Sequence, residues 1–142
     1  MKISNELKEY LVKEIRFVKE KMIAEKNPLK KNYFYSAVYG ALDRSFKMEY
    51  DSLLVFSHFA FVMSYNTIQG TLAEITQSGG LSVLPLDDKD FEFIIKQLEN
   101  YAKAIETNAD EEIYHILEKV IEHAYSLSGP GHYLIEKGVI KK

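Results

Sequence analysis

The sequence predicts an all-α protein, and three observations carry this prediction. Apolar residues recur at spacings of three and four along most of the chain, the period of an amphipathic helix. Only three Pro and seven Gly interrupt 142 residues, whereas a β-sandwich needs turn residues about every eight to twelve positions. The charged residues are mostly Lys and Glu, which favour helices. We therefore expect one domain over residues 1–142, an antiparallel bundle of four long helices with one or two shorter ones.

The first long helix is expected over Asn5–Lys26. Its apolar stripe has members four, four, three and four positions apart: Leu7, Leu11, Ile15, Val18 and Met22. Asn27 should end this helix, because the residue before a proline, here Pro28, avoids the α conformation. A shorter second helix is expected over Asn32–Lys47, and residues 133–142 should add one short turn.

The third helix is expected to be long and central. Asp51 is a suitable N-cap, and the helix should end before Gly79-Gly80. Its first half is apolar on nearly every side, which is typical of an enclosed helix. The most apolar stretch, Leu53–Met63, is too short to cross a bilayer, so we expect no membrane partner.

Two more long helices are predicted by their start signals. Asp87 followed by Asp90 is a variant of the capping box and should open the fourth helix. Asn108 followed by Glu111 repeats the pattern for the fifth helix, which Gly129-Pro130 should stop. The short link between these two helices should make them antiparallel neighbours.

Composition excludes several classes of function. The absence of Cys removes disulfides, Cys-ligated zinc and thiol nucleophiles. With 21 acidic against 18 basic residues and a formal net charge of −3, no nucleic-acid partner is expected. Charged residues throughout residues 1–11 leave no apolar core of a signal peptide, so a cytoplasmic location is expected. The joint enrichment of Lys and Glu is also a thermophile-like feature.

One Glu-x-x-His motif, formed by Glu112 and His115, has the spacing of di-iron sites in helical bundles. Such a site needs a second motif and two more inward carboxylates, and no other His follows an acid by three positions. His115 also falls opposite the apolar stripe of its helix, on the solvent side. We therefore expect no metal site and no cofactor.

A polar line along the third helix is the strongest candidate for a ligand site. Asp51, His58 and Tyr65 are seven positions apart and Gln69 is four further on, so all four share one side of the helix. If buried, this seam could bind a small polar ligand, or a metal through His58. The alternative, which we favour, is a structural hydrogen-bond network or a wet contact between subunits.

Arg44 lies near the junction of the second and third helices. Its guanidinium could hold a carboxylate or phosphate with two hydrogen bonds. The favoured alternative is that Arg44 pairs with Glu49 or Asp51 and fixes the junction. Nothing in the spacing requires acid–base chemistry, and no catalytic residue is assigned.

Ten Tyr and eight Phe are more than one small bundle readily encloses. The second helix carries an extra apolar face made of Tyr35, Tyr39, Leu42 and Phe46. Phe93 falls off the apolar stripe of the fourth helix. Tyrosine suits partly wet contacts because its ring packs while its hydroxyl stays bonded. We therefore predict a homo-oligomer that uses these residues.

The chain resembles a small family of uncharacterised archaeal helical-bundle proteins. The resemblance rests on Tyr39–Phe46, on Asp51 and on the aromatic run through Tyr65-Asn66. It implies a bundle of four long antiparallel helices and a subunit that self-associates, and it brings no activity.

Two functions follow as hypotheses. The first is a self-associating structural or interaction module without catalysis. The second is a small-ligand or metal-binding protein, or an enzyme, that uses the polar seam with Arg44 nearby.

Overall fold

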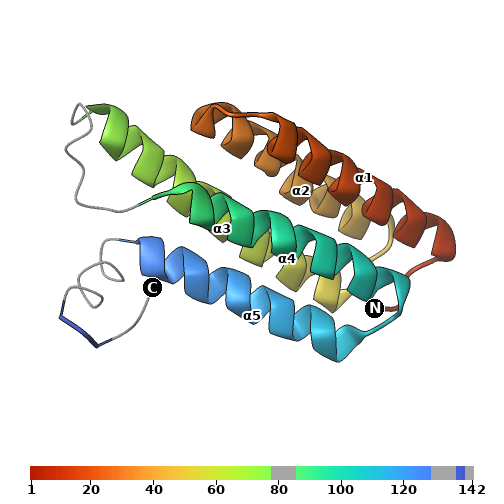
Figure 1. Cartoon of the computed structure of the whole chain (residues 1–142). Helices are drawn as coiled ribbons and strands as arrows, with labels where there is room; N and C mark the ends of the chain where they lie inside the picture. Colours follow the sequence, from red (N-terminus) through yellow and green to blue (C-terminus); the bar gives the residue numbers. More distant parts are fainter. Residues whose placement is uncertain (78–85, 129–136, 140–142) are drawn as a thin grey trace.

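The computed structural model describes residues 1–77, 86–128 and 137–139, with the backbone alone for residues 73–77 (Figure 1). It contains five helices: α1 Asn5–Ala24, α2 Pro28–Met48, α3 Ser52–Gln77, α4 Asp88–Glu106 and α5 Asp110–Leu127. These residues form no strand, so the all-α prediction is confirmed. None of the described helices is long and apolar enough to cross a membrane.

The second helix is not a short one. α2 has 21 residues, against 20 in α1 and 18 in α5, so the division into four long helices and shorter ones is wrong. The expected stop of the first helix at Asn27-Pro28 is confirmed, since α1 ends at Ala24, but the same pair also starts α2 four residues before the expected Asn32. The Asn27 side chain accepts hydrogen bonds from the N–H groups of Leu29 and Lys30, at 2.9 and 3.2 Å. Proline is favoured in the first helical turn because it has no N–H to leave unpaired there.

The five helices form a closed ring. α1 packs on α2 and α4, α2 on α3, α3 on α5, and α5 on α4. Going round the ring, four of these pairs are antiparallel, but α3 and α5 lie side by side and run the same way (Figure 1). The rings of Phe56 and Tyr114, both near the starts of their helices, lie 5.9 Å apart. A ring with an odd number of helices cannot alternate in direction throughout, so the expected antiparallel arrangement fails at this pair.

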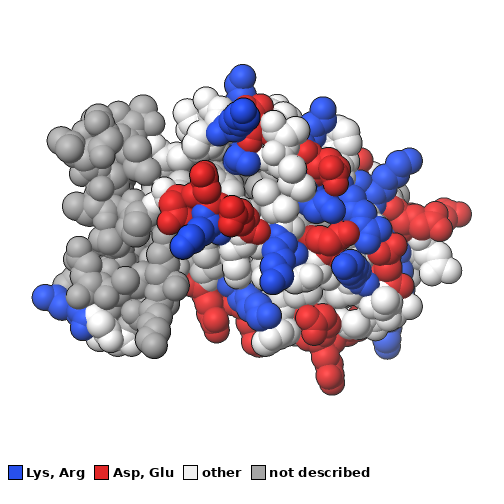
Figure 2. Space-filling view, in the orientation of Figure 1, with Lys and Arg blue, Asp and Glu red and all other residues white. Residues whose placement is uncertain are grey.

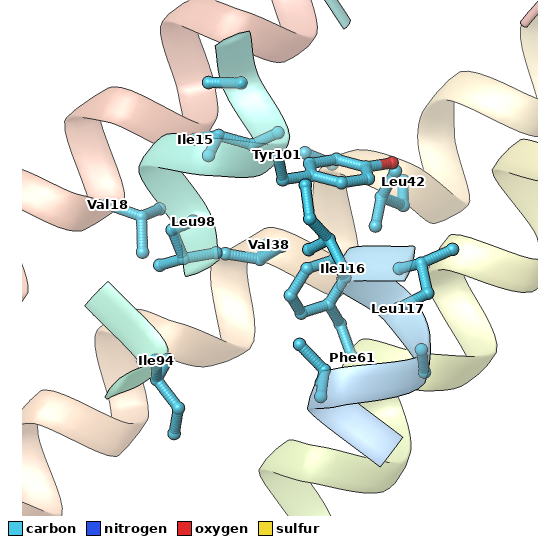
Figure 3. Close-up of a cluster of buried hydrophobic side chains, with 14 of the residues drawn as sticks. Ile15, Val18, Val38, Leu42, Phe61, Ile94, Leu98, Tyr101, Ile116 and Leu117 are labelled. Atoms are coloured by element: carbon cyan, nitrogen blue, oxygen red, sulfur yellow. The ribbon is translucent and has the colours of Figure 1, made fainter. Parts of the chain in front are cut away.

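All five helices contribute to one apolar core (Figure 3). The labelled side chains are Ile15, Val18, Val38, Leu42, Phe61, Ile94, Leu98, Tyr101, Ile116 and Leu117. α3 and α4 are not neighbours in the ring, yet Phe61 and Tyr101 meet across its centre with ring centroids 5.3 Å apart. The stripe predicted for α1 points into this core, as do the buried apolar residues of α4 and α5.

The helix ends test the predicted caps. Asp51 caps α3 through Leu53 and Leu54, and Asp87 forms the expected capping box with Asp90. Asn108 does not cap α5. It has a φ of 54°, and the next residue's N–H returns to the carbonyl of Ala104 at 2.9 Å, which is how a helix C-terminus closes. The expected stops at residues 79–80 and 129–130 lie outside the described residues, as does most of the turn expected over residues 133–142.

Candidate functional site

The middle of the predicted seam lies in an aromatic cluster between α2 and α3. This cluster consists of Tyr39 and Phe46 from α2 with His58 and Tyr65 from α3. Phe46 meets the His58 ring edge-on at 5.3 Å between centroids, and Tyr39 meets it at 6.1 Å. Tyr39 also meets Tyr65 at 5.4 Å. All four side chains are half-buried, and no described residue hydrogen-bonds the imidazole, so His58 is held by ring packing.

Asp51, at one end of the seam, holds backbone N–H groups. Its carboxylate accepts hydrogen bonds from Lys2, Leu53 and Leu54, at 3.0, 2.9 and 3.2 Å. Partial burial raises the pKa of Asp51, but these backbone donors and the N-terminal ammonium together lower it more, so the net pKa lies below its ordinary value. Asp51 therefore ties the N-terminal segment to the start of α3.

Gln69, at the other end, is hydrogen-bonded to α2. Its Oε1 accepts a hydrogen bond from Nδ2 of Asn32 at 2.9 Å, and the same amide reaches the Tyr65 carbonyl at 3.5 Å. Asn32 is fully buried, and its Oδ1 has no hydrogen-bond partner among the described residues. The seam is therefore divided into three separate contacts, and its four members do not converge on one ligand position.

The histidines and acids of the described chain do not gather into a metal site. No group of three or more His, Asp or Glu side chains there is placed to hold an ion. Glu112 and His115 are both exposed on α5, on the solvent side.

Arg44 does not pair with Glu49 or Asp51, which corrects the favoured interpretation of the junction. Its Nε donates to the Tyr10 hydroxyl of α1 at 3.0 Å. Glu49 is instead bound by the backbone N–H and the hydroxyl of Ser4, at 2.8 and 2.5 Å. Both carboxylates are therefore hydrogen-bonded to the N-terminal segment, Glu49 to Ser4 and Asp51 to Lys2. The sequence pattern does not reveal the position of this segment.

The residues predicted to form an oligomer interface are used inside the single chain. Tyr35 and Leu42 are 1% and 0% exposed, so they belong to the core and cannot lie on a free face of this fold. Tyr39 and Phe46 pack in the aromatic cluster against α3. The second apolar face of α2 is thus the face that α3 covers, because α2 lies between α1 and α3 in the ring.

Phe93, the fifth predicted interface residue, packs on a histidine that sequence reasoning missed. Its ring stacks on His123 of α5 at 4.6 Å between centroids and 27° between planes. The Nε2 atom of His123 lies 2.9 Å from Oδ1 of Asp90, which is 4% exposed. The Nδ1 atom of His123 is buried without a hydrogen-bond partner in the described structure. No local signal could have found this pair, since its members are 33 positions apart.

Small hydroxyl residues on the inner face of α3 were also missed. Ser57, Ser64 and Thr71 are seven apart and buried. The Tyr35 hydroxyl donates to Ser64 Oγ at 2.8 Å. Burial raises the pKa of Tyr101, and the nearby Ser57 hydroxyl lowers it by less, without completing a hydrogen bond to the Tyr101 oxygen. The signal available in the sequence was the heptad spacing of the three hydroxyl residues.

The outward side of α3 carries exposed apolar side chains. Phe59 is 57% exposed and Val55 is 36% exposed, one helical turn apart. Val62 and Met63 continue the row and are half-buried. We call these four residues, with the flanking Phe56, the outer face of α3. The chain has no Lys, Arg, Asp or Glu between Ser52 and Ala73, so this face is also uncharged.

The opposite side of the molecule differs in character. Figure 2 shows Lys and Arg interleaved with Asp and Glu across the face that carries α1, α4 and α5. Arg16 illustrates the pattern, since it contacts Glu106 at 2.6 Å and Glu99 at 3.2 Å and so links α1 to α4. These two acids, Glu106 the more strongly, raise the pKa of Arg16 against a smaller effect of burial.

Comparison with protein-family models, with curated proteins and with solved structures finds no match for this chain. The resemblance to an archaeal bundle family stays a prediction. Function therefore has to be argued from the geometry of the chain itself.

Proposed function

We propose that this chain is a self-associating helical module, and that two copies dock through the outer face of α3. The exposure of Phe59 carries the proposal, because 57% of a large aromatic side chain lies in water on a helix whose other side is fully packed. Burying an exposed aromatic or aliphatic side chain is worth about 1.5–3 kcal/mol. Val55, one turn away, adds to the same patch, so its burial in a dimer is favourable.

The lack of charge on this face supports a second copy as the occupant. Around a twofold axis a surface meets itself, so any charged group near the axis comes close to its own copy. Between Ser52 and Ala73 no Lys, Arg, Asp or Glu is present to cause such repulsion. The face that carries α1, α4 and α5 bears many charged side chains, so a twofold axis there would bring like charges together (Figure 2).

The surroundings of the face fit an interface with an apolar centre and a polar rim. On the α5 side, Tyr114 is 44% exposed and packs against Phe56. Exposed Glu111 and Glu118 lie one turn to either side of Tyr114 on α5. On the α2 side, the half-buried aromatic cluster continues the surface. Apolar residues of α2 and α5 thus adjoin the outer face of α3 on its two sides.

The experiment compares two equivalent substitutions by sedimentation equilibrium. Phe59→Glu places a charge in the centre of the outer face. Phe17→Glu is the matched control, since Phe17 is 58% exposed on α1 under the Lys21 ammonium. We expect twice the 16.4 kDa chain mass for the unmodified protein and for Phe17→Glu, and the chain mass for Phe59→Glu.

An unmodified chain that stays monomeric at submillimolar concentration overturns the proposal. A dimer that Phe17→Glu dissociates and Phe59→Glu leaves intact places the interface elsewhere and also overturns it. Circular dichroism checks that both variants are folded, and Val55→Lys repeats the test should Phe59→Glu lose helix.

A further inference from the structure

The two arginines of the chain stand in opposite situations. Arg16 is neutralised by two glutamates. The only hydrogen-bond partner of Arg44 in the described structure is the neutral Tyr10 hydroxyl, at 3.0 Å from Nε. No carboxylate of the described residues lies within ion-pairing distance of the Arg44 guanidinium. The phenol therefore orients this cation without neutralising it, and leaves its two terminal nitrogens as donors.

Three carboxylates close to Arg44 in the chain are committed to other groups. Glu49 accepts hydrogen bonds from Ser4, and Asp51 accepts them from Lys2 and from the start of α3. Asp43 is paired with the Lys47 ammonium. The hydrogen bonds from Ser4 also lower the pKa of Glu49. Moving Glu49 or Asp51 onto Arg44 would break the hydrogen bonds that Ser4 or Lys2 donates to it. Glu6, which lines the same groove as Arg44, forms no ion pair with it in the described structure, so the positive charge of Arg44 is left for a group from outside the chain.

Arg44 faces a groove between the start of α1 and the end of α2. The groove has a volume of about 400 Å³, within the range of small-ligand sites. Leu7, Tyr10 and Met48 give it an apolar lining, and Met48 is 73% exposed. Gly40 lies one turn before Arg44, where an added Cβ would be 3.5 Å from the guanidinium. The site therefore combines one oriented cation with an apolar surface.

We propose that this groove binds a small monocarboxylate with an apolar tail. The terminal nitrogens of Arg44 hold the carboxylate, and the tail lies along the exposed Met48, with the buried Leu7 at the base of the groove. Two acids on the groove wall, Glu6 and Glu49, make a dianion such as a phosphate monoester a poorer ligand. A neutral alcohol of the same length lacks the charge that Arg44 pairs with. This site is separate from the outer face of α3, so neither proposal depends on the other.

The test is a titration of the full chain with octanoate, followed by NMR shifts of the methyl groups of Leu7 and Met48. We expect saturable shifts at millimolar octanoate, and weaker shifts with octanol and octyl phosphate. Arg44→Gln should raise the Kd about tenfold, as expected for a charge-assisted pair. Lys103→Gln is the matched control, because it removes a positive charge at an exposed position of α4 outside the groove lining.

Two further variants separate the roles of the groove residues. Tyr10→Phe removes the hydroxyl that positions Arg44, and should weaken octanoate binding by less than Arg44→Gln does. Glu6→Gln removes a carboxylate that repels the ligand and should strengthen octanoate binding. The proposal is overturned if octanoate shifts neither methyl group, if Arg44→Gln and Lys103→Gln raise the Kd equally, or if octanol binds as well as octanoate. Binding that is unchanged in Phe59→Glu keeps this result distinct from self-association.

Discussion

The Asp90 carboxylate and the His123 imidazole join the start of α4 to the end of α5 through a 2.9 Å contact between Oδ1 and Nε2. The second carboxylate oxygen of Asp90 accepts the N–H of Asp87 at 2.9 Å and closes the capping box. Phe93 stacks on the other partner, His123. One buried aspartate thus completes a local helix cap and a contact between two helices.

Loss of the imidazole should remove one hydrogen bond to the buried Asp90 carboxylate. His123→Phe keeps a ring to stack on Phe93 but removes the donor at 2.9 Å. We expect the free energy of unfolding to fall by about 2 kcal/mol, the cost of losing a hydrogen bond to a buried charged group. Urea denaturation measures it. His115→Phe, at an exposed histidine of the same helix, should change stability by less than about 0.5 kcal/mol. Equal effects of the two substitutions would contradict the assignment.

The two core tyrosines should respond differently to loss of the hydroxyl. Tyr35→Phe removes the 2.8 Å hydrogen bond to Ser64 and should destabilise the chain by about 1 kcal/mol. Tyr101→Phe removes a buried hydroxyl that has no hydrogen-bond partner in the described structure, so it should be neutral or stabilising. Each variant serves as the control of the other in urea denaturation. A larger loss for Tyr101→Phe than for Tyr35→Phe would be inconsistent with these hydrogen bonds.

Asp51 should make part of the stability depend on acid pH. Its net pKa is lowered in the folded chain, because the backbone donors outweigh burial. A lowered pKa means that its contribution is present above about pH 3.9, the ordinary aspartate value, and is lost as the pH falls further. Asp51→Asn should therefore be less stable than the unmodified chain at neutral pH and should lose less stability between pH 4 and about pH 2.

The matched control for this pH series is Asp43→Asn. Asp43 contacts the exposed Lys47 and no buried group, so its removal should leave the acid limb of the stability curve unchanged. Thermal unfolding followed by circular dichroism across the series provides the measurement. If Asp51→Asn and the unmodified chain lose the same stability as the pH falls, groups other than Asp51 cause the loss of stability in acid.

Local signals predicted the helices and some of their ends well. The capping box of Asp87 and Asp90 and the N-cap of Asp51 act within one turn, so the sequence pattern contains the whole interaction. The same kind of signal misled at Asn108, while at Asn27-Pro28 it marked the end of α1 and missed the start of α2. Asparagine suits both an N-cap and the left-handed residue that closes a helix, and the choice depends on which helix the neighbouring chain continues.

The candidate sites were less accessible to sequence reasoning. The helical wheel put Asp51, His58, Tyr65 and Gln69 correctly on one side of α3, but their partners outside α3 come from two other segments, the N-terminal segment and α2. The residue type of Arg44 made it a candidate for binding an anion. That its guanidinium is not paired with Glu49 depends on the N-terminal segment, whose Ser4 binds Glu49 instead. A helix period gives the direction of a side chain and does not say which group it meets.

The sequence by itself determined the fold class of the protein and which side of most of its helices faces the core. Those properties depend on residues three or four positions apart, whose geometry is set by the backbone period. The tertiary structure decided the order of the helices in the ring, the parallel pairing of α3 with α5, and the pairing of Asp90 with His123. It also decided that α3 covers the second apolar face of α2 and leaves Phe59 exposed. These outcomes depend on how whole helix surfaces compete for one core, and no local spacing specifies that competition.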